Sequence, residues 1–310
     1  MPSRVVKFPP EKTIGKLKVR RRGFLDEWLG DARGAVEVPR GDLWLVAPKD
    51  QEFDLTTLDE INPNDLQALS LSEAKIDLTQ IPRVAQLVGL QTLLLANTGI
   101  TDPQVEQLRS LSNLRWLDIS DNPIDGYSSA ALADLPIEVL IASETKLKDE
   151  ALEPLGLMKG IEILSLGFTE FGEVGMNAIS SLRSLRSLSV PRTAITDEGL
   201  AAITKLSRIR RLNVSANDIG DKGLSYIAAL PNLEALELGG TKITNEGLAH
   251  LRGAGSLLSL RVTKTALTDG AVPYLAQLKL LKYISIDGTG ISVAGMERLK
   301  QMLPRAAVFR

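Results

Sequence analysis

The sequence contains no cysteine and a single histidine, His250. Disulfides, thiolate metal sites and a cysteine nucleophile are therefore excluded. Aromatic residues make up only 4% of the chain, although hydrophobic residues make up 44%, so the apolar content is aliphatic. This composition is typical of a regular, layered core and not of an aromatic-lined catalytic cleft. We expect no cofactor.

The sequence also lacks a strong charge and a long apolar run. Its formal net charge is −2, so we expect neither nucleic acid nor a membrane surface as a partner. No segment approaches the roughly 18 uninterrupted apolar residues of a membrane helix. Residues 1–22 have no apolar stretch like that of a secretory signal. We therefore expect a soluble, cytoplasmic protein.

The chain contains a regular internal repeat. A core of the form LxxLxL, with apolar residues at its first, fourth and sixth positions, occurs ten times, and eight of the nine intervals are 24 residues long. The copies begin at Leu66, Leu90, Leu114, Ile137, Ile161, Leu185, Ile209, Leu233, Leu257 and Leu281. Periods of this length indicate a solenoid, in which stacked coils bury the leucines that one coil cannot bury alone.

The pattern of each repeat predicts a strand, a turn, a helix and a segment that leads back to the next strand. The alternation at the end of the core is typical of a short strand with its leucines on one face. The ninth position is threonine in seven copies and asparagine in two, Asn122 and Asn217, and such side chains can bond the free backbone groups of a turn. A Thr-Asp-x-Gly-Leu segment follows, in which Thr or Asp can cap a helix and the glycine marks close packing.

The ten copies of LxxLxLxxN/TxI resemble the leucine-rich repeat. Their 24-residue length and segments such as "ITDEGL" are similar to helix-containing bacterial repeats, including the GALA class, and to ribonuclease-inhibitor-type repeats. The resemblance covers the chain from Leu66 onward. It implies an α/β fold, a right-handed horseshoe-shaped solenoid with a parallel sheet on the concave face and short helices on the convex face. It also implies protein binding as the usual task.

We divide the chain into a β-rich N-terminal capping region, residues 1–60, and a repeat array with a C-terminal cap, residues 61–310. Strand-like segments fill most of the capping region, and "GFLDEWLG" (23–30) predicts one or two helical turns. The segment "LWLVA" (43–47) lies one period before the strand of Leu69, so we expect the two to pair in parallel. A last helix, a stop at Pro304 and a closing strand around Val308 are expected at the other end.

The first 22 residues form a basic strip. They carry eight lysines and arginines, including Arg21 and Arg22, against one glutamate. The strip is either the solvated face of edge strands, where lysines prevent edge pairing, or a docking patch for an acidic partner or a nucleic-acid backbone. The absence of interleaved aromatic residues favours the first interpretation.

The sequence offers little for catalysis. His250 lies on a predicted convex helix, where we interpret it as a half-exposed helix residue and not as a general base. The recurring aspartates stand one per coil at helix starts, where capping accounts for them and where they cannot gather around one metal ion. These aspartates are Asp102, Asp149, Asp197, Asp221 and Asp269. We expect no enzymatic activity and no metal site.

Candidate binding residues stand between the leucines of each strand, where side chains face the concave surface. At these positions, apolar residues fall on four neighbouring predicted strands and charged residues border them. An aromatic residue, Tyr283, stands near the end of the array. The predicted partner-binding residues are Leu94, Trp116, Asp118, Val139, Ile141, Ile163, Phe168, Arg192, Arg211, Arg261 and Tyr283. An exposed apolar patch with a tryptophan and a charged rim is typical of a binding hot spot. A homodimer contact, or cover by the cap or its loops, is the alternative.

We therefore predict a non-enzymatic module that binds a partner protein through its concave face. One alternative is a substrate-recognition subunit of a ubiquitin-ligase-like assembly, as some GALA-type proteins are. Those proteins carry a helical F-box segment before the repeats, whereas residues 1–60 read as β-rich. A second alternative is a binder of nucleic acid or an anionic ligand, which would use the basic strip and the concave arginines.

Overall fold

The computed structural model describes residues 3–20 and 26–310 of the chain. The chain divides into two compact units, residues 1–146 and residues 147–310. Arg21 and Arg22 of the basic strip lie outside the described residues. The separation of a capping region at residue 60 stays a prediction.

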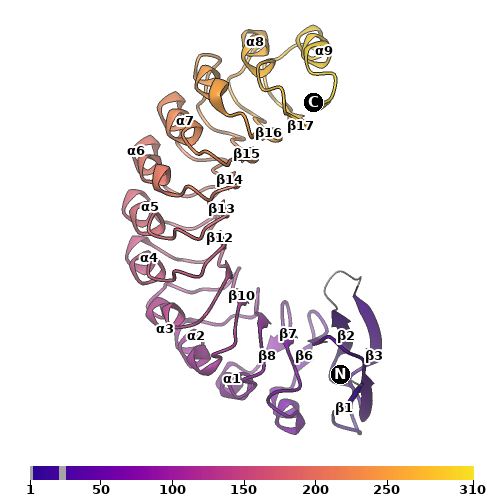
Figure 1. Cartoon of the computed structure of the whole chain (residues 1–310). Helices are drawn as coiled ribbons and strands as arrows, with labels where there is room; N and C mark the ends of the chain where they lie inside the picture. The colour runs from indigo at the N-terminus through magenta and orange to yellow at the C-terminus, as the bar shows by residue number, and fades with distance from the viewer. Residues whose placement is uncertain (1–2, 21–25) are drawn as a thin grey trace. The chain divides into compact units, whose positions relative to one another are not determined.

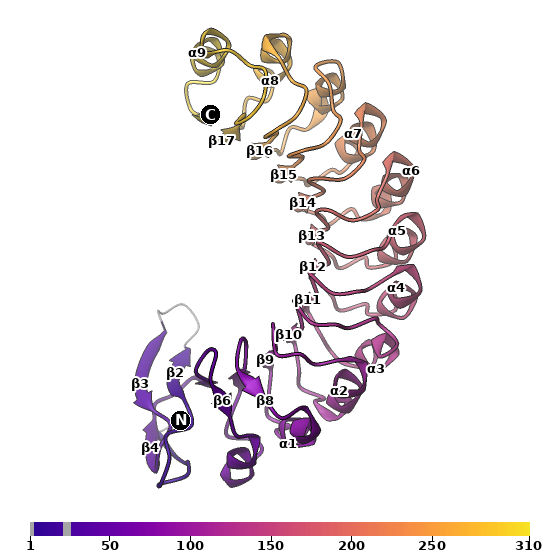
Figure 2. The same cartoon turned by 180° about the vertical axis from the view of Figure 1, so that it is seen from behind.

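The first unit combines a small antiparallel region with the first coils of the array (Figure 2). Its strands are β1 (Arg4–Lys7), β2 (Lys16–Arg20), β3 (Glu27–Asp31), β4 (Ala35–Val38), β5 (Asp42–Val46), β6 (Glu52–Phe53), β7 (Ala68–Ser70), β8 (Lys75–Ile76), β9 (Thr92–Leu94), β10 (Trp116–Asp118) and β11 (Val139–Ile141). Its helices are η1 (Leu55–Glu60), η2 (Leu78–Gln80), α1 (Ile81–Ala85), α2 (Asp102–Gln107), η3 (Leu108–Ser110) and α3 (Ser129–Ala133), where η marks a 3₁₀ helix.

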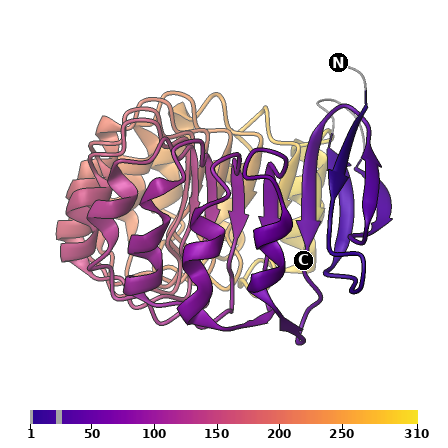
Figure 3. The ribbon, with the colours of Figure 1, turned by 90° about the horizontal axis from the view of Figure 1, so that it is seen from below.

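The main sheet of this unit runs in the order β3-β2-β5-β7-β9-β10-β11. Strand β2 is antiparallel to both β3 and β5, and Figure 3 shows these indigo strands at one end of the unit. From β5 onward the strands are parallel, and Leu45 is the register partner of Leu69. The predicted parallel pairing of residues 43–47 is thus confirmed.

The helical prediction for residues 23–30 is wrong where it can be tested. Residues 23–25 lie outside the described residues, and Glu27–Asp31 is strand β3. Backbone pairing with β2 outweighs the local helical pattern, because a helix this short is unstable without tertiary packing.

The second unit consists of regular coils. Its strands are β12 (Ile163–Ser165), β13 (Ser187–Ser189), β14 (Arg211–Asn213), β15 (Ala235–Glu237), β16 (Ser259–Arg261), β17 (Tyr283–Ser285) and β18 (Ala307–Phe309). Its helices are α4 (Asp149–Leu155), α5 (Glu173–Ile179), α6 (Asp197–Leu200), η4 (Ala201–Lys205), α7 (Asp221–Ala228), η5 (Gly247–Gly253), η6 (Asp269–Ala271), α8 (Val272–Leu275) and α9 (Val293–Met302).

Each strand from β12 to β18 pairs in parallel with the next. Figure 1 shows the helices of this unit on one side and the strands on the other. The leucines of the repeat cores lie between these two layers and are buried, for example Leu188 and Leu212. The predicted closing strand around Val308 is β18, and the predicted last helix is α9.

The ninth position of the repeat closes the turn after the strand, as predicted. The Thr241 hydroxyl donates to the Leu238 carbonyl at 2.7 Å. Asn217 reaches farther, because its amide donates to the carbonyl of Val190 in the preceding coil at 2.7 Å and accepts from the Thr193 N–H at 2.8 Å. The asparagine therefore binds two coils together with one buried side chain.

The recurring aspartates do cap helices, but those of the following coil. Asp102 accepts from the backbone N–H groups of Gly126 at 3.0 Å and Ser128 at 2.9 Å, near the start of α3. Asp149 accepts in the same way from Gly172 at 2.9 Å and Gly175 at 2.7 Å, at the start of α5. A repeat period does not distinguish these two arrangements, because every coil carries both the aspartate and the helix start.

A glycine near the start of the helix makes room for this carboxylate in several coils, at Gly175, Gly223, Gly247 and Gly295. A Cβ on Gly175 would lie 2.9 Å from Asp149 Oδ1 and 2.8 Å from Phe171 Cδ2. The predicted close-packing role is confirmed for Gly223 and Gly247, where a Cβ would collide with Asp197 and Asp221, whereas a Cβ on Gly199 would make only ordinary contacts at 3.4 Å or more. Ser128 stands at the equivalent position beside Asp102, and there the side-chain hydroxyl itself donates to the carboxylate at 2.8 Å.

Candidate functional site

The face of each sheet that points away from the helices, here called the free face, carries the predicted binding residues. On the first unit, one line of register partners crosses the free face from β3 to β11. Its members are Trp28, Lys18, Trp44, Ala68, Thr92, Trp116 and Val139. We call it the tryptophan row, because it holds all three tryptophans of the chain.

Trp44 is the tryptophan of this row that is buried, and two cations lie over its ring. The Lys18 ammonium and the Arg20 guanidinium carbon each lie 4.4 Å from the centroid of its ring, which is cation–π geometry. The side chain is 6% exposed. Trp28, on the other side of Lys18, is 61% exposed and its ring centroid lies 5.7 Å from the same ammonium.

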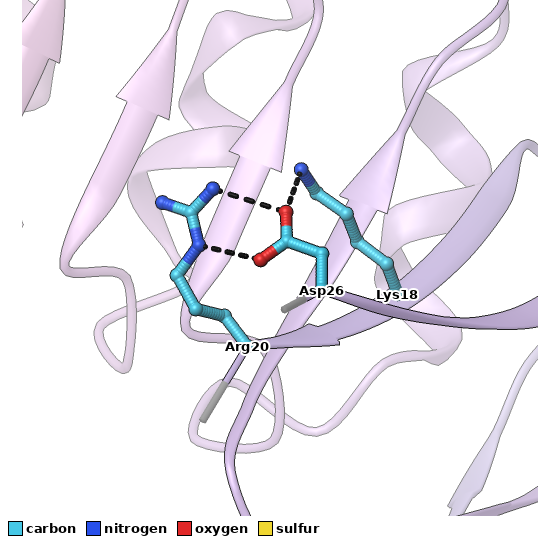
Figure 4. Close-up of polar contacts among 3 residues, drawn as sticks. All are labelled: Lys18, Arg20 and Asp26. Carbon is cyan, nitrogen blue, oxygen red and sulfur yellow. Dashed lines mark hydrogen bonds and ion pairs between the residues drawn. The ribbon is translucent and has the colours of Figure 1, made fainter. Parts of the chain in front are cut away.

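Asp26 bridges the two cations (Figure 4). Its carboxylate accepts from Lys18 Nζ at 2.8 Å and from Arg20 Nε and Nη2 at 2.9 and 3.1 Å. These bonds, from Arg20 first and then Lys18, hold the pKa of Asp26 well below its usual range. The sequence analysis missed this cluster, because it assembles across antiparallel strands whose pairing the repeat period does not predict.

The predicted residues of the first unit lie together. Trp116 stands between Thr92 and Val139, and Leu94, Asp118 and Ile141 form the adjacent line of register partners. All of these side chains are half-buried, so the ring of Trp116 is partly accessible as expected. Its Nε1 is buried and has no hydrogen-bond partner among the described residues.

The predicted residues Ile163, Phe168 and Arg192 lie on two neighbouring coils of the second unit, and Phe168 contacts Arg192. Phe168 is 49% exposed and Ile163 is also exposed. The Arg192 guanidinium carbon lies 5.6 Å from the Phe168 ring centroid. The Phe168 N–H donates to the Pro191 carbonyl at 2.8 Å, which fixes its turn against the next coil.

Phe168 occupies a backbone conformation that disfavours its side chain. Its φ is 60°, in the left-handed region that bulky residues rarely adopt. Every coil has a left-handed residue at this repeat position: Gly240 and Gly288 have φ values of 68° and 67°, and the other coils carry non-glycine residues with φ values between 51° and 62°. Glycine adopts this conformation without cost, whereas another residue pays roughly 1–2 kcal/mol. An exposed aromatic residue at a strained position is a candidate for function.

The remaining predicted residues of this unit lie on strands β14, β16 and β17. Arg261 forms an ion pair with Glu237 at 3.5 Å, and Arg211 is exposed on β14. Tyr283 is exposed on β17, five strands from Ile163, which corresponds to about 24 Å at the usual strand spacing. Tyr283 therefore does not share one contact patch with Phe168. That the apolar residues of the two units form a single patch stays a prediction.

The single histidine, His250, is exposed on η5. Across residues 3–20 and 26–310, no group of three or more His, Asp or Glu residues is arranged to hold a metal ion. In the same residues, no helix has both the length and the apolar character needed to cross a membrane.

Comparisons with known proteins agree with the repeat pattern. Two family models, both described as leucine-rich repeat, match the chain, one at residues 181–203, 208–228 and 229–251 and the other at residues 113–135. No curated protein matches the sequence. The GALA-like type of the repeat stays a prediction.

Two solved structures of internalins are similar in fold. An internalin from Listeria monocytogenes is 21% identical with a TM-score of 0.65, and the match covers 86% of this chain and 79% of the internalin. Internalin C2 from the same species is 24% identical with a TM-score of 0.56, and the match covers 67% of this chain and 84% of that protein. At these identities the likeness shows the fold, an α/β solenoid of leucine-rich repeats.

Proposed function

Because the chain is a leucine-rich-repeat protein, we propose that it is a non-enzymatic interaction module that binds a partner protein through the free face of its sheet, the face predicted to be concave. A cytoplasmic location belongs to the same proposal. It is supported by the absence of cysteine, which fits a reducing compartment.

The observation that carries the proposal is the state of Phe168. A bulky aromatic side chain is half exposed in a left-handed turn, where the other coils have glycine, alanine, or a polar or charged residue. The exposed apolar surface costs free energy in the isolated protein, and burial against a partner recovers part of that cost. Arg192 stacks on the ring and would stay with it in an interface, where Arg and aromatic residues are enriched.

Phe168→Gly tests the proposal, because it separates binding from stability. The variant removes the aromatic ring and also relieves the backbone strain, so its melting temperature should stay the same or rise. Its binding should weaken at least about tenfold, the usual effect of losing an aromatic anchor. The measurement is quantitative capture from a cell extract by wild type and variant, followed by the affinity of the captured protein.

Val174→Ala is the matched control. Val174 is an exposed apolar residue on helix α5, on the side away from the free face. The Val174→Ala variant should capture the same protein as wild type, with unchanged affinity. Equal affinities for wild type and Phe168→Gly, or an equal loss for Val174→Ala, would contradict a partner site at Phe168.

A further inference from the structure

A pocket of about 470 Å³ lies at the C-terminal end of the second unit. Its lining comes from the residues just before β17, from the first residue of β17 and from the turn between α9 and β18. Tyr283 is the register partner of Ala307, and the Ala307 N–H donates to the Lys282 carbonyl at 2.8 Å. The walls are thus held together by the sheet.

Three cations surround this pocket: Lys279, Lys282 and Arg305. None of them has an acidic partner within salt-bridge distance in the second unit, all of whose residues the structure describes. The pocket therefore presents uncompensated positive charge.

The repeat shows why Lys282 is left without a partner. At the equivalent position of other coils, charges of opposite sign stand side by side and pair, Arg186 with Glu162 at 3.5 Å and Arg210 with Glu234 at 2.6 Å. Leu258 occupies this position in the coil before Lys282, so no carboxylate is available there.

The pocket also has an apolar side. Tyr283 and Leu280 line it and are each 56% exposed. Its volume lies in the range of pockets that bind small ligands or a few side chains, roughly 300–1,000 Å³. Exposed apolar side chains inside a rim of one charge sign are complementary to a segment that has an apolar side chain flanked by carboxylates.

We propose that this pocket binds an acidic segment of a partner protein, with an apolar side chain against Tyr283 and Leu280 and carboxylates at Lys279, Lys282 and Arg305. A single aromatic ring beside a leucine favours a peptide over a nucleic acid, because sequence-tolerant binding of single strands needs successive stacking rings along a basic groove. The inference goes beyond the proposed function and does not depend on Phe168.

The test uses the full chain and a short fluorescein-labelled peptide of glutamates with one central leucine, followed by fluorescence anisotropy. Wild type should bind it saturably, and added salt should weaken binding because the rim charges are screened. Lys282→Ala combined with Arg305→Ala should weaken binding at least about tenfold. Tyr283→Ala should also weaken binding but keep the salt dependence.

The chain offers a matched control, because Lys159 is the repeat equivalent of Lys279 and is exposed. Lys159→Ala and Phe168→Gly should both leave peptide affinity unchanged, and the second result separates this site from the proposed function. No saturable binding, or equal affinities for Lys159→Ala and the double variant, would overturn the proposal. Displacement of the peptide by an equal concentration of oligothymidine would assign the pocket to nucleic acid instead.

Discussion

Replacing Gly175 by alanine tests whether the repeat glycines exist to admit the aspartate of the preceding coil. The new Cβ would lie 2.5 Å from Leu152 Cδ1, 2.8 Å from Phe171 Cδ2 and 2.9 Å from Asp149 Oδ1. Leu152 and Phe171 are completely buried, so neither can rotate out of the way. The carboxylate would have to leave the N–H groups of Gly172 and Gly175.

The expected change in the free energy of unfolding combines one stabilising and two destabilising contributions. Alanine in a helix interior is about 1 kcal/mol more favourable than glycine. Overpacking a full core costs about 1–3 kcal/mol, and hydrogen bonds to a charged group contribute about 1.5–3 kcal/mol each. With both bonds lost the contributions sum to about 3–8 kcal/mol. We expect Gly175→Ala to lower the free energy of unfolding by an amount near the lower end of this range, about 3–4 kcal/mol, measured by urea unfolding followed by far-ultraviolet circular dichroism.

Gly253→Ala is the control, because a Cβ at Gly253 would meet no atom within 4 Å. It should change stability by less than about 0.5 kcal/mol. The effects of Gly175→Ala and Asp149→Ala should also be non-additive by more than about 0.5 kcal/mol, since both disturb the same carboxylate. If Gly175→Ala were as stable as Gly253→Ala, the steric argument for the repeat glycine would be refuted.

Two further predictions concern the first unit. Trp116→Ala should lower the melting temperature much less than Leu117→Ala, whose loss from the core should cost about 2–5 kcal/mol; equal losses in a thermal melt would make the tryptophan structural. Burial raises the pKa of Asp102, but hydrogen bonds from Ser128 and from other backbone N–H groups outweigh it and lower the pKa below 3.8. Because the folded pKa is the lower one, this stabilisation is present above about pH 4 and is lost as the pH falls through the folded value. The stability difference between wild type and Asp102→Asn should therefore shrink below pH 4 in urea titrations, and a difference that persists in acid would contradict the assignment.

Much of this fold could be predicted because the same local sequence pattern recurs in every coil of the array. The leucine spacing predicts the strands, the threonine or asparagine predicts the turn, and the glycine predicts a close contact. Even the coil before the first clear repeat could be placed, since Leu45 stands one period before Leu69 and pairs with it. Short-range periodicity carries this information because every coil packs on a neighbour built to the same pattern.

The candidate sites were predictable only in part. The exposure of Phe168 follows from its place beyond a strand end. Its left-handed backbone does not follow from the residue type, because eight of the ten coils have a non-glycine residue in this conformation.

The sequence alone determined the coil, its core and the direction of its side chains, because these depend on contacts that recur with the period. Tertiary structure alone decided three features: which coil each aspartate caps, the strand formed by Glu27–Asp31 and the alignment of three tryptophans in one row. The aspartates repeat with the same period as the helices they cap, so their spacing cannot reveal the partner. The other two features depend on antiparallel pairing of strands outside the repeat, and pairing of that kind leaves no periodic signal.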